Sequence, residues 1–192
     1  MSAASASSSP DDRLTLEQFI VEMGTQPVDE LSHDQLQQLV HRLDLSGDLI
    51  EARTCFAKDA YARNLVCRTP AFELLVLCWK PGHESTIHDH VGSLNAITVH
   101  RGALTSRIFV PADGVPAGAG PVVLDHTDTF LPGQGWTGVD RHGIHQLANI
   151  GTEDLVTVHV YAAPLTTLTV YSVDSSEVEV RPLRYTLAED LA

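Results

Sequence analysis

Basic residues are scarce in this sequence of 192 residues: 12 Lys and Arg stand against 25 Asp and Glu, which gives a formal net charge of -13. A chain with this excess of negative charge repels phosphate backbones and anionic lipid surfaces, so we expect no nucleic-acid or membrane partner. The sequence also lacks an apolar run of about 20 residues, the length that a membrane-spanning helix needs.

Cysteine is equally rare. Cys55, Cys67 and Cys78 are the three in the sequence, they form no CxxC pair, and an odd number cannot all pair with one another. This usage fits a reducing compartment. The first ten residues, MSAASASSSP, have neither the basic region nor the apolar region of a secretory signal. We therefore expect a cytoplasmic protein whose residues 1–11 form a disordered tail.

Length and composition predict a single domain. A chain of 192 residues suits one hydrophobic core, and a hydrophobic content of 43% with 19% charged residues is typical of a packed globular protein. Within that domain the patterning changes once along the chain. We expect an N-terminal helical region over residues 12–60 and a β-barrel over residues 61–192.

The helical region carries recognisable start signals. Thr15 with Gln18, and Ser32 with Gln35, each have the spacing of a capping box. After Ser32, apolar residues recur at the spacing of one helix face. They are Leu36, Leu39, Val40 and Leu43. A third short helix is predicted over residues 49–57.

The remainder of the chain has the pattern of short strands. The predicted strands are NLVCRT, FELLVLCW, LNAITVH, ALTSRIFV, VVLDH, WTGVD, LVTVHVY and TLTVYSV, and the segments between them are rich in Gly, Pro, Asn and Asp. Because closure removes exposed sheet edges, this many short strands favours a sandwich or a small barrel. The fold class is therefore predicted to be mainly β.

The chain has 10 histidines, nearly as many as all its Lys and Arg together. His88 and His90 lie two residues apart, so in an extended strand both rings face one side while Asp89 faces the other. Imidazole is the commonest metal ligand, and His145 near the start of another predicted strand can supply a third. His142 remains an alternative for that third position.

Two stretches of the sequence resemble the motifs of the cupin superfamily. The segment from Gly82 to Gly102 resembles the first cupin motif in the spacing of its glycines and of the His-Asp-His triplet. His145, followed after three residues by Asn149, resembles the second motif. One departure is that Asn95 stands where many cupins have a metal-binding glutamate. The resemblance implies a single cupin barrel of jelly-roll type.

Four segments together are similar to the cysteine dioxygenase family, a group of thiol-oxidising cupins. These are YARNLV, LCWKPGHESTIHDH, GIHQLAN and TVHVYAAP, in this order over about the central hundred residues. The resemblance implies one Fe(II) ion per chain, held by His88, His90 and His145.

The same resemblance implies roles for three further residues. Arg63 would bind the substrate carboxylate, because a guanidinium is permanently charged and bidentate. His159 and Tyr161 would be the catalytic pair beside the metal, with the Tyr161 hydroxyl also contacting substrate and His159 orienting it. Animal members of the family carry a cysteine at the position of Asn95, which forms a thioether to the active-site tyrosine. This sequence cannot form that link.

Three neutral imidazoles leave the charge of a metal ion uncompensated and one of its faces open, unlike the two-His-one-carboxylate triad. Such a site favours an anionic ligand, and a thiolate is both soft and negatively charged. This chemistry agrees with the activity that the resemblance implies, which is oxidation of L-cysteine by O2 to cysteine sulfinate.

Other functions remain open at this point. Nothing in the sequence clearly recognises an amine, so 3-mercaptopropionate is an alternative substrate. A cupin that binds a metal or a small ligand without turnover is a second alternative. A third is an isomerase using Mn or Zn on the same fold.

Overall fold

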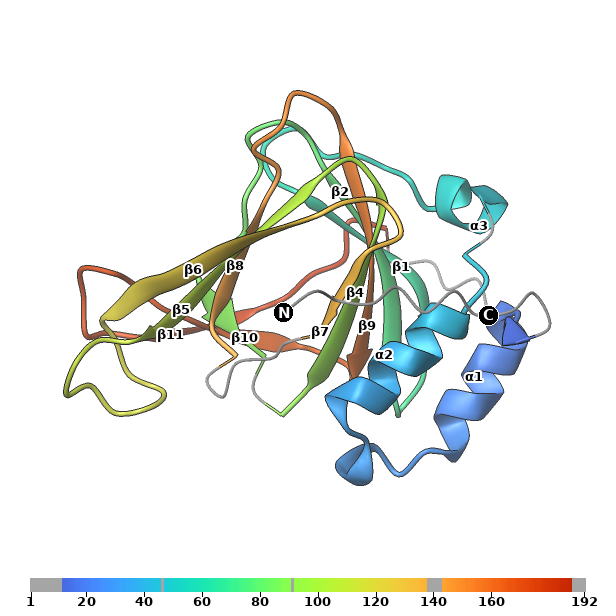
Figure 1. Cartoon of the computed structure of the whole chain (residues 1–192), viewed down its shortest axis with the longest axis horizontal. Helices are drawn as coiled ribbons and strands as arrows, with labels where there is room; N and C mark the ends of the chain where they lie inside the picture. Colours follow the sequence, from blue (N-terminus) through green and yellow to red (C-terminus); the bar gives the residue numbers. More distant parts are fainter. Residues whose placement is uncertain (1–11, 46, 91, 138–142, 188–192) are drawn as a thin grey trace.

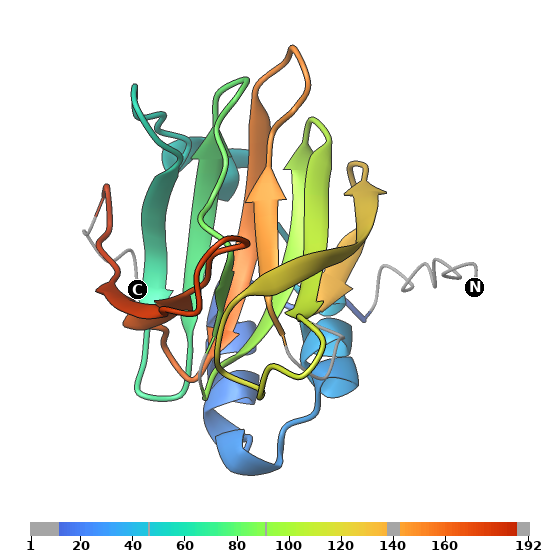
Figure 2. The same cartoon turned by 90° about the vertical axis from the view of Figure 1, so that its left-hand side faces the viewer.

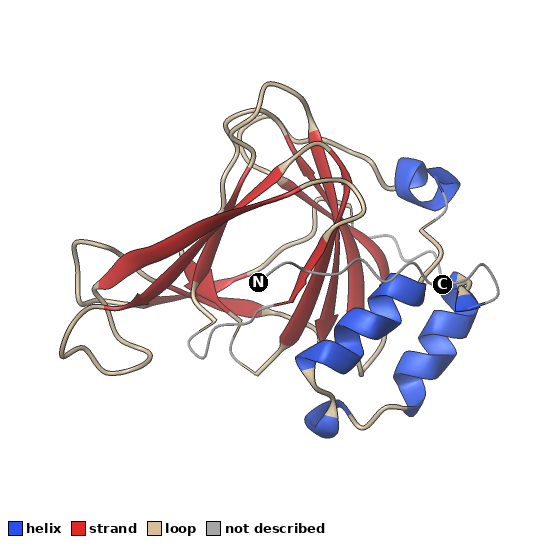
Figure 3. Cartoon of the chain, viewed as in Figure 1, coloured by secondary structure: helices blue, strands red, loops and turns tan. Residues whose placement is uncertain are grey.

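The computed structural model describes residues 12–45, 47–90, 92–137 and 143–187. The predicted disordered tail, residues 1–11, lies outside these. Two β-sheets form the body of the molecule, and the helices lie together on the outer side of one of them (Figures 1 and 3). The expectation of a mainly β fold with a short N-terminal helical region is confirmed.

The helices are α1 (Leu16–Thr25), the 3-10 turn η2 (Val28–Glu30), α2 (His33–Arg42) and α3 (Gly47–Ala52). Both predicted capping boxes are present. The hydroxyls of Thr15 and Ser32 accept from the backbone N–H of Gln18 and Gln35, and the backbone N–H of each cap residue donates to the side-chain oxygen of that glutamine. None of the helices in the described ranges has the length and apolar character needed to cross a bilayer.

The third helix ends five residues earlier than predicted. The Asn64 side-chain amide donates to the backbone carbonyls of Arg53, at 2.9 Å, and Cys55, at 3.0 Å. These carbonyls are therefore held by a strand residue instead of by amides of a continuing helix. A contact between segments distant in sequence thus overrides the local helical preference.

The strands form two sheets. One has the order β1-β2-β9-β4-β7 and comprises Ala62–Arg68, Glu73–Trp79, Leu155–Ala162, Leu94–Arg101 and Gly135–Thr137. The other has the order β11-β10-β3-β8-β5-β6 and comprises Glu179–Pro182, Thr167–Val170, His88–Asp89, His145–Ala148, Leu104–Pro111 and Val122–Phe130. The sheets face each other across the interior, as the edge-on view in Figure 1 shows, and in Figure 2 the six-stranded sheet lies in front of the other. The arrangement is a jelly roll of two sheets and not a closed barrel.

The burial of strand β2 shows that the five-stranded sheet is covered on both faces. All seven of its residues are buried. Alternate side chains pack outward against α1 and α2, and the others pack inward between the sheets. The outward set is Leu74, Val76 and Cys78, and the inward set includes Leu75, Leu77 and Trp79. The helical region therefore serves as a cover for this sheet.

Gly102 is the turn residue that carries the chain from β4 in one sheet to β5 in the other. Its φ is +85°, in the left-handed region that favours glycine. A Cβ at this position would lie 2.8 Å from the carbonyl oxygen of Asp154 and 2.9 Å from the Cα of Leu155. Only glycine allows the backbone to pass this closely, which fixes where the two sheets diverge.

Candidate metal centre and active site

The three histidines expected to bind a metal, His88, His90 and His145, lie together between the sheets. His88 on β3 pairs directly with His145 on β8, and His90 follows the end of β3. The Nε2 atom of His88 is 3.1 Å from that of His90 and 3.2 Å from that of His145. Among the described residues, these three alone bring three potential ligand atoms of His, Cys, Asp or Glu into one group, all within 4.8 Å of one another.

The residue between the paired histidines faces the other way, as the strand geometry predicts. Asp89 accepts a 2.6 Å hydrogen bond from the hydroxyl of Tyr171. Tyr171 belongs to a separate apolar cluster with Phe109, Val122 and Ile144. The carboxylate of Asp89 is thus engaged away from the three imidazoles, and the cluster consists of neutral ligands.

The protonation states of these rings favour metal binding. The Nδ1 of His88 lies 2.8 Å from the carbonyl oxygen of Thr86, which can only accept, so Nδ1 carries the proton and Nε2 presents a lone pair. Burial lowers the pKa of His88 to about 4, and it also lowers the pKa values of His90 and His145 well below the ordinary range. Three neutral nitrogen donors this close together fit a divalent transition metal.

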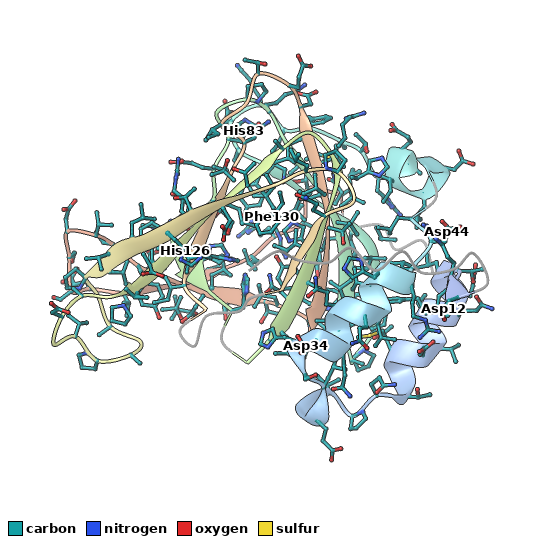
Figure 4. All side chains as sticks on the ribbon, in the orientation of Figure 1. Asp12, Asp34, Asp44, His83, His126 and Phe130 are labelled. Carbon is teal, nitrogen blue, oxygen red and sulfur yellow. The ribbon has the colours of Figure 1, made fainter. Side chains whose placement is uncertain are left out.

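Other histidines lie elsewhere. Figure 4 labels His83 near one end of the molecule and His126 on β6. The Nδ1 of His83 accepts from the backbone amide of Lys80 at 3.1 Å, and His126 is half exposed beside Asp125 at 2.8 Å. His142, the alternative third ligand, lies outside the described residues.

The inner face of the five-stranded sheet supplies the remaining predicted residues. Tyr161 on β9 has its ring 5.3 Å from that of His90. The guanidinium carbon of Arg63 on β1 lies 5.6 Å from the centre of the Tyr161 ring. Arg63, His159 and Tyr161 are all buried. The structure therefore brings together every site residue that the sequence singled out, with the histidine cluster on one sheet and the other groups facing it.

A line of hydrogen bonds runs along this inner face. The indole N–H of Trp79 donates to the Thr157 hydroxyl at 3.0 Å, which lies 2.9 Å from Nε2 of His159. Nδ1 of His159 is in turn 3.1 Å from the hydroxyl of Tyr161. Because Trp79 can only donate, Thr157 is free to donate to His159, whose Nδ1–H then donates to Tyr161. In this arrangement the proton of Tyr161 is directed away from His159.

Burial also sets the state of the tyrosine and of its neighbour. It raises the pKa of Tyr161 far above the ordinary value, so this group remains a protonated phenol. Asn95 on β4 is directly opposite Tyr161 and is buried. The Nδ2 of Asn95 has no hydrogen-bond partner among the described residues. An amide, with no sulfur, thus occupies the position beside the phenol.

Arg63 has a buried partner that the sequence analysis did not identify. Its Nη2 lies 3.3 Å from the carboxylate of Glu73 on β2, whose side chain is completely inaccessible to solvent. The Nε of Arg63 is buried and lacks a hydrogen-bond partner in the described part of the chain. Arg63 also makes a side-chain hydrogen bond with Tyr161. The guanidinium is therefore held by Glu73 and Tyr161, while its Nε–H remains available to a ligand.

Sequence reasoning missed three contributors to this site. Thr157 was detectable, because it precedes His159 by two residues and so shares its face of β9. Glu73 was detectable as a single acid within an otherwise apolar strand. Tyr185, which hydrogen-bonds to Glu73, carries no such signal because its segment has no regular pattern.

A family model described as cysteine dioxygenase type I matches residues 5–174. The rat protein named "Cysteine dioxygenase type 1" is 28% identical over 141 residues, which cover 72% of this chain and 69% of the rat protein. The human protein of the same name has the same identity and coverage. The zebrafish (Danio rerio) protein is 31% identical over 116 residues, 57% of this chain and 54% of its own length.

A solved structure supports the fold. An uncharacterised protein with a double-stranded β-helix domain from Klebsiella pneumoniae matches with a TM-score of 0.50 and 17% identity, covering 64% of this chain and 88% of its own. The double-stranded β-helix is the cupin fold, so the predicted fold class is confirmed. Because the family model covers most of the sequence, the chain is a dioxygenase-type oxidoreductase that belongs to the cysteine dioxygenase type I family.

Proposed function

We propose that this protein is an Fe(II)-dependent thiol dioxygenase that oxidises L-cysteine with O2 to cysteine sulfinate. The observation that carries the proposal is the pairing of three neutral imidazoles on one sheet with Arg63 and the Tyr161 phenol on the facing sheet. Both atoms of O2 are added to the thiol sulfur, so one thiol and one O2 yield one sulfinic acid with no other oxidant or reductant.

His88, His90 and His145 are the residues that would hold the metal. Bound there, Fe(II) would supply the redox chemistry and the coordination positions for thiol and O2. Because the three rings are neutral, the site favours a ligand that brings negative charge, as a thiolate does. Coordination also lowers the pKa of a thiol, which makes the thiolate the form that binds.

Arg63 and Tyr161 provide recognition and proton placement. The free Nε–H of Arg63, with the adjacent Nη, can donate to a substrate carboxylate. Tyr161 keeps its proton at neutral pH, so its hydroxyl can donate to an oxygen atom of substrate or O2. The line from Trp79 to His159 fixes where that hydroxyl points.

A second substrate, 3-mercaptopropionate, is favoured by the partners of Glu73. The amine of cysteine would be recognised by a carboxylate, and Glu73 is the buried acid beside Arg63. Its oxygens already accept from Arg63, from the backbone amide of Leu165 and from the hydroxyl of Tyr185. Glu73 is therefore already occupied and is not needed to bind a substrate amine. A thiol carboxylate without an amine, such as 3-mercaptopropionate, can use Arg63 and the metal in the same way as cysteine.

The deciding experiment is O2 consumption by the Fe(II)-loaded protein with cysteine, 3-mercaptopropionate, cysteamine and a thiol-free amino acid. We expect uptake with the carboxylate thiols, at one O2 per thiol, and none with the thiol-free compound. Absence of uptake with all thiols by fully loaded protein would instead favour a metal-binding cupin without turnover.

The hydrogen-bonded line predicts a specific effect of Thr157. Thr157→Val preserves the shape of the side chain and removes the hydroxyl between Trp79 and His159. We expect kcat to fall by about tenfold, since loss of a buried hydrogen bond typically costs about 1–1.5 kcal/mol, while metal content stays unchanged. Steady-state O2 uptake and metal analysis of the same preparation test this. Thr105→Val, at a buried threonine on β5, is a matched control.

Tyr161 is expected to remain an unmodified phenol. Asn95 stands directly opposite it and offers no sulfur for a thioether. The intact mass after many turnovers should equal the mass calculated from the sequence. A loss of two hydrogens that maps to a peptide containing Tyr161 would contradict this, as would a lag in activity that shortens with prior turnover.

A further inference from the structure

Glu73 is a buried carboxylate that the proposed reaction does not use. Its side chain is fully inaccessible, and such a charge is costly unless donors surround it. Three donors do so: Nη2 of Arg63 at 3.3 Å, the backbone N–H of Leu165 at 3.3 Å and the hydroxyl of Tyr185 at 2.5 Å. The shortest of these contacts comes from the part of the chain that follows β11.

That part, residues 183–187, is here called the C-terminal segment. It lies beyond residue 174, where the match to the family model ends. It runs alongside β1, the strand that carries Arg63. The backbone N–H of Thr186 donates to the carbonyl of Arg63 at 2.7 Å, and the N–H of Arg63 donates to the Thr186 hydroxyl at 3.1 Å. The N–H of Leu65 donates to the carbonyl of Leu187 at 2.9 Å.

The hydrogen bonds of Tyr185 have a defined direction. Nη1 of Arg68 donates to the Tyr185 oxygen at 3.2 Å, so the phenol proton is left for Glu73. Burial and the bond to Glu73 raise the pKa of Tyr185 to about 12, which keeps the phenol protonated at physiological pH. Tyr185 is therefore a permanent donor to the carboxylate that holds Arg63.

Arg63 and Glu73 are coupled in a way that bears on substrate binding. Glu73 accepts from Nη2 of the guanidinium and, with the Tyr161 hydroxyl, orients it, while Nε has no partner among the described residues. Because Tyr185 donates a hydrogen bond to Glu73, it partly neutralises that carboxylate and so weakens the attraction between Glu73 and Arg63. Without that proton, Glu73 would attract the guanidinium more strongly and compete better with the carboxylate of a substrate.

We propose that Tyr185 and Glu73 are positioning residues for Arg63, through which the C-terminal segment sets the affinity of the enzyme for thiols that carry a carboxylate. The proposal rests on the proposed function in one respect, the assignment of Arg63 to the substrate carboxylate. It extends the recognition machinery to Glu73, inside the matched family region, and to Tyr185, which lies beyond it.

The first test is Tyr185→Phe, which removes the hydroxyl and keeps the ring. For cysteine and 3-mercaptopropionate we expect KM to rise about tenfold with kcat within about twofold, because orientation of the ground-state partner changes and the reacting groups do not. The rate with cysteamine, which has no carboxylate, should stay the same. Arg181→Gln is the matched control, since it removes an exposed ion pair with Glu179 from neighbouring β11.

The second test measures binding without turnover. Calorimetric titration of the Fe(II)-loaded protein with 3-mercaptopropionate under anaerobic conditions should give a Kd about tenfold weaker for Tyr185→Phe than for the unmodified protein. In an Arg63→Ala background, Tyr185→Phe should add less than twofold, because the residue through which it acts is gone. Thermal unfolding of each variant reports any general loss of stability.

Three outcomes would overturn the proposal. They are an unchanged Kd in Tyr185→Phe, an equal loss for cysteamine, and an undiminished effect in the Arg63→Ala background. Failure of the proposed function is distinguishable from these, because it would appear as absence of O2 uptake in the unmodified protein. The calorimetric comparison would still report whether Tyr185 governs carboxylate binding.

Discussion

His145→Ala is expected to leave the purified protein with little bound metal. The variant removes one of three ligands whose nitrogen atoms lie within 4.8 Å of one another, and two imidazoles alone cannot complete the site. Changes to groups that merely orient a ligand already lower metal affinity by about 10–100-fold, so loss of a ligand should exceed the upper end of that range. Metal content after purification, measured by mass spectrometry, gives the result directly.

The controls for this prediction are other histidines. His83→Ala should retain metal, because His83 interacts with the backbone of Lys80 and does not belong to the cluster. His88→Ala and His90→Ala should behave like His145→Ala. If His145→Ala kept its full metal content while His142→Ala lost it, the third ligand would have to be reassigned.

Arg63→Ala is expected to abolish the preference for thiols with a carboxylate. Removing one partner of a buried charged pair costs about 2–5 kcal/mol, which corresponds to roughly 30-fold to several thousand-fold in kcat/KM. Cysteine and 3-mercaptopropionate should lose by this factor, while cysteamine should change little. Arg63→Lys should rescue only part of the loss, because an ammonium does not reproduce the bidentate guanidinium.

The structure adds a requirement to this experiment. Arg63→Ala also leaves Glu73 buried without its cation, which by itself can destabilise the fold by about 3–5 kcal/mol. The double variant Arg63→Ala, Glu73→Gln removes that uncompensated charge, so its kinetics report recognition alone. A double variant that is stably folded and still prefers 3-mercaptopropionate to cysteamine would assign recognition to another cation.

The parts of the site that were predictable follow from strand geometry. Two histidines separated by one residue share a face of an extended chain, and the same rule relates His159 to Tyr161. Capping boxes at Thr15 and Ser32 located the first two long helices because their hydrogen bonds are local. Where the determining contact was local in sequence, the residues alone predicted it.

The parts that were not predictable depend on contacts across the fold. Helix α3 is shortened by Asn64 on β1, which lies about a dozen residues later. Strand β11 was not predicted. Its four residues alternate in polarity, but all four are exposed, so the strand buries no apolar face that would mark it. The carboxylate of Glu73 acquires its role from Tyr185, 112 residues away. No periodicity encodes such pairings, since they arise only when the sheets assemble.

The two sheets divide the site between them, and this has a consequence for how such enzymes can diverge. The candidate metal ligands come from β3, β8 and the residue after β3, whereas Arg63, His159 and Tyr161 come from β1 and β9. Mutations on β1, β2 or the C-terminal segment can therefore alter substrate choice while the ligand cluster stays intact. Substrate specificity for a new thiol can therefore change through mutations in the five-stranded sheet, while the six-stranded sheet keeps the residues that would bind the metal.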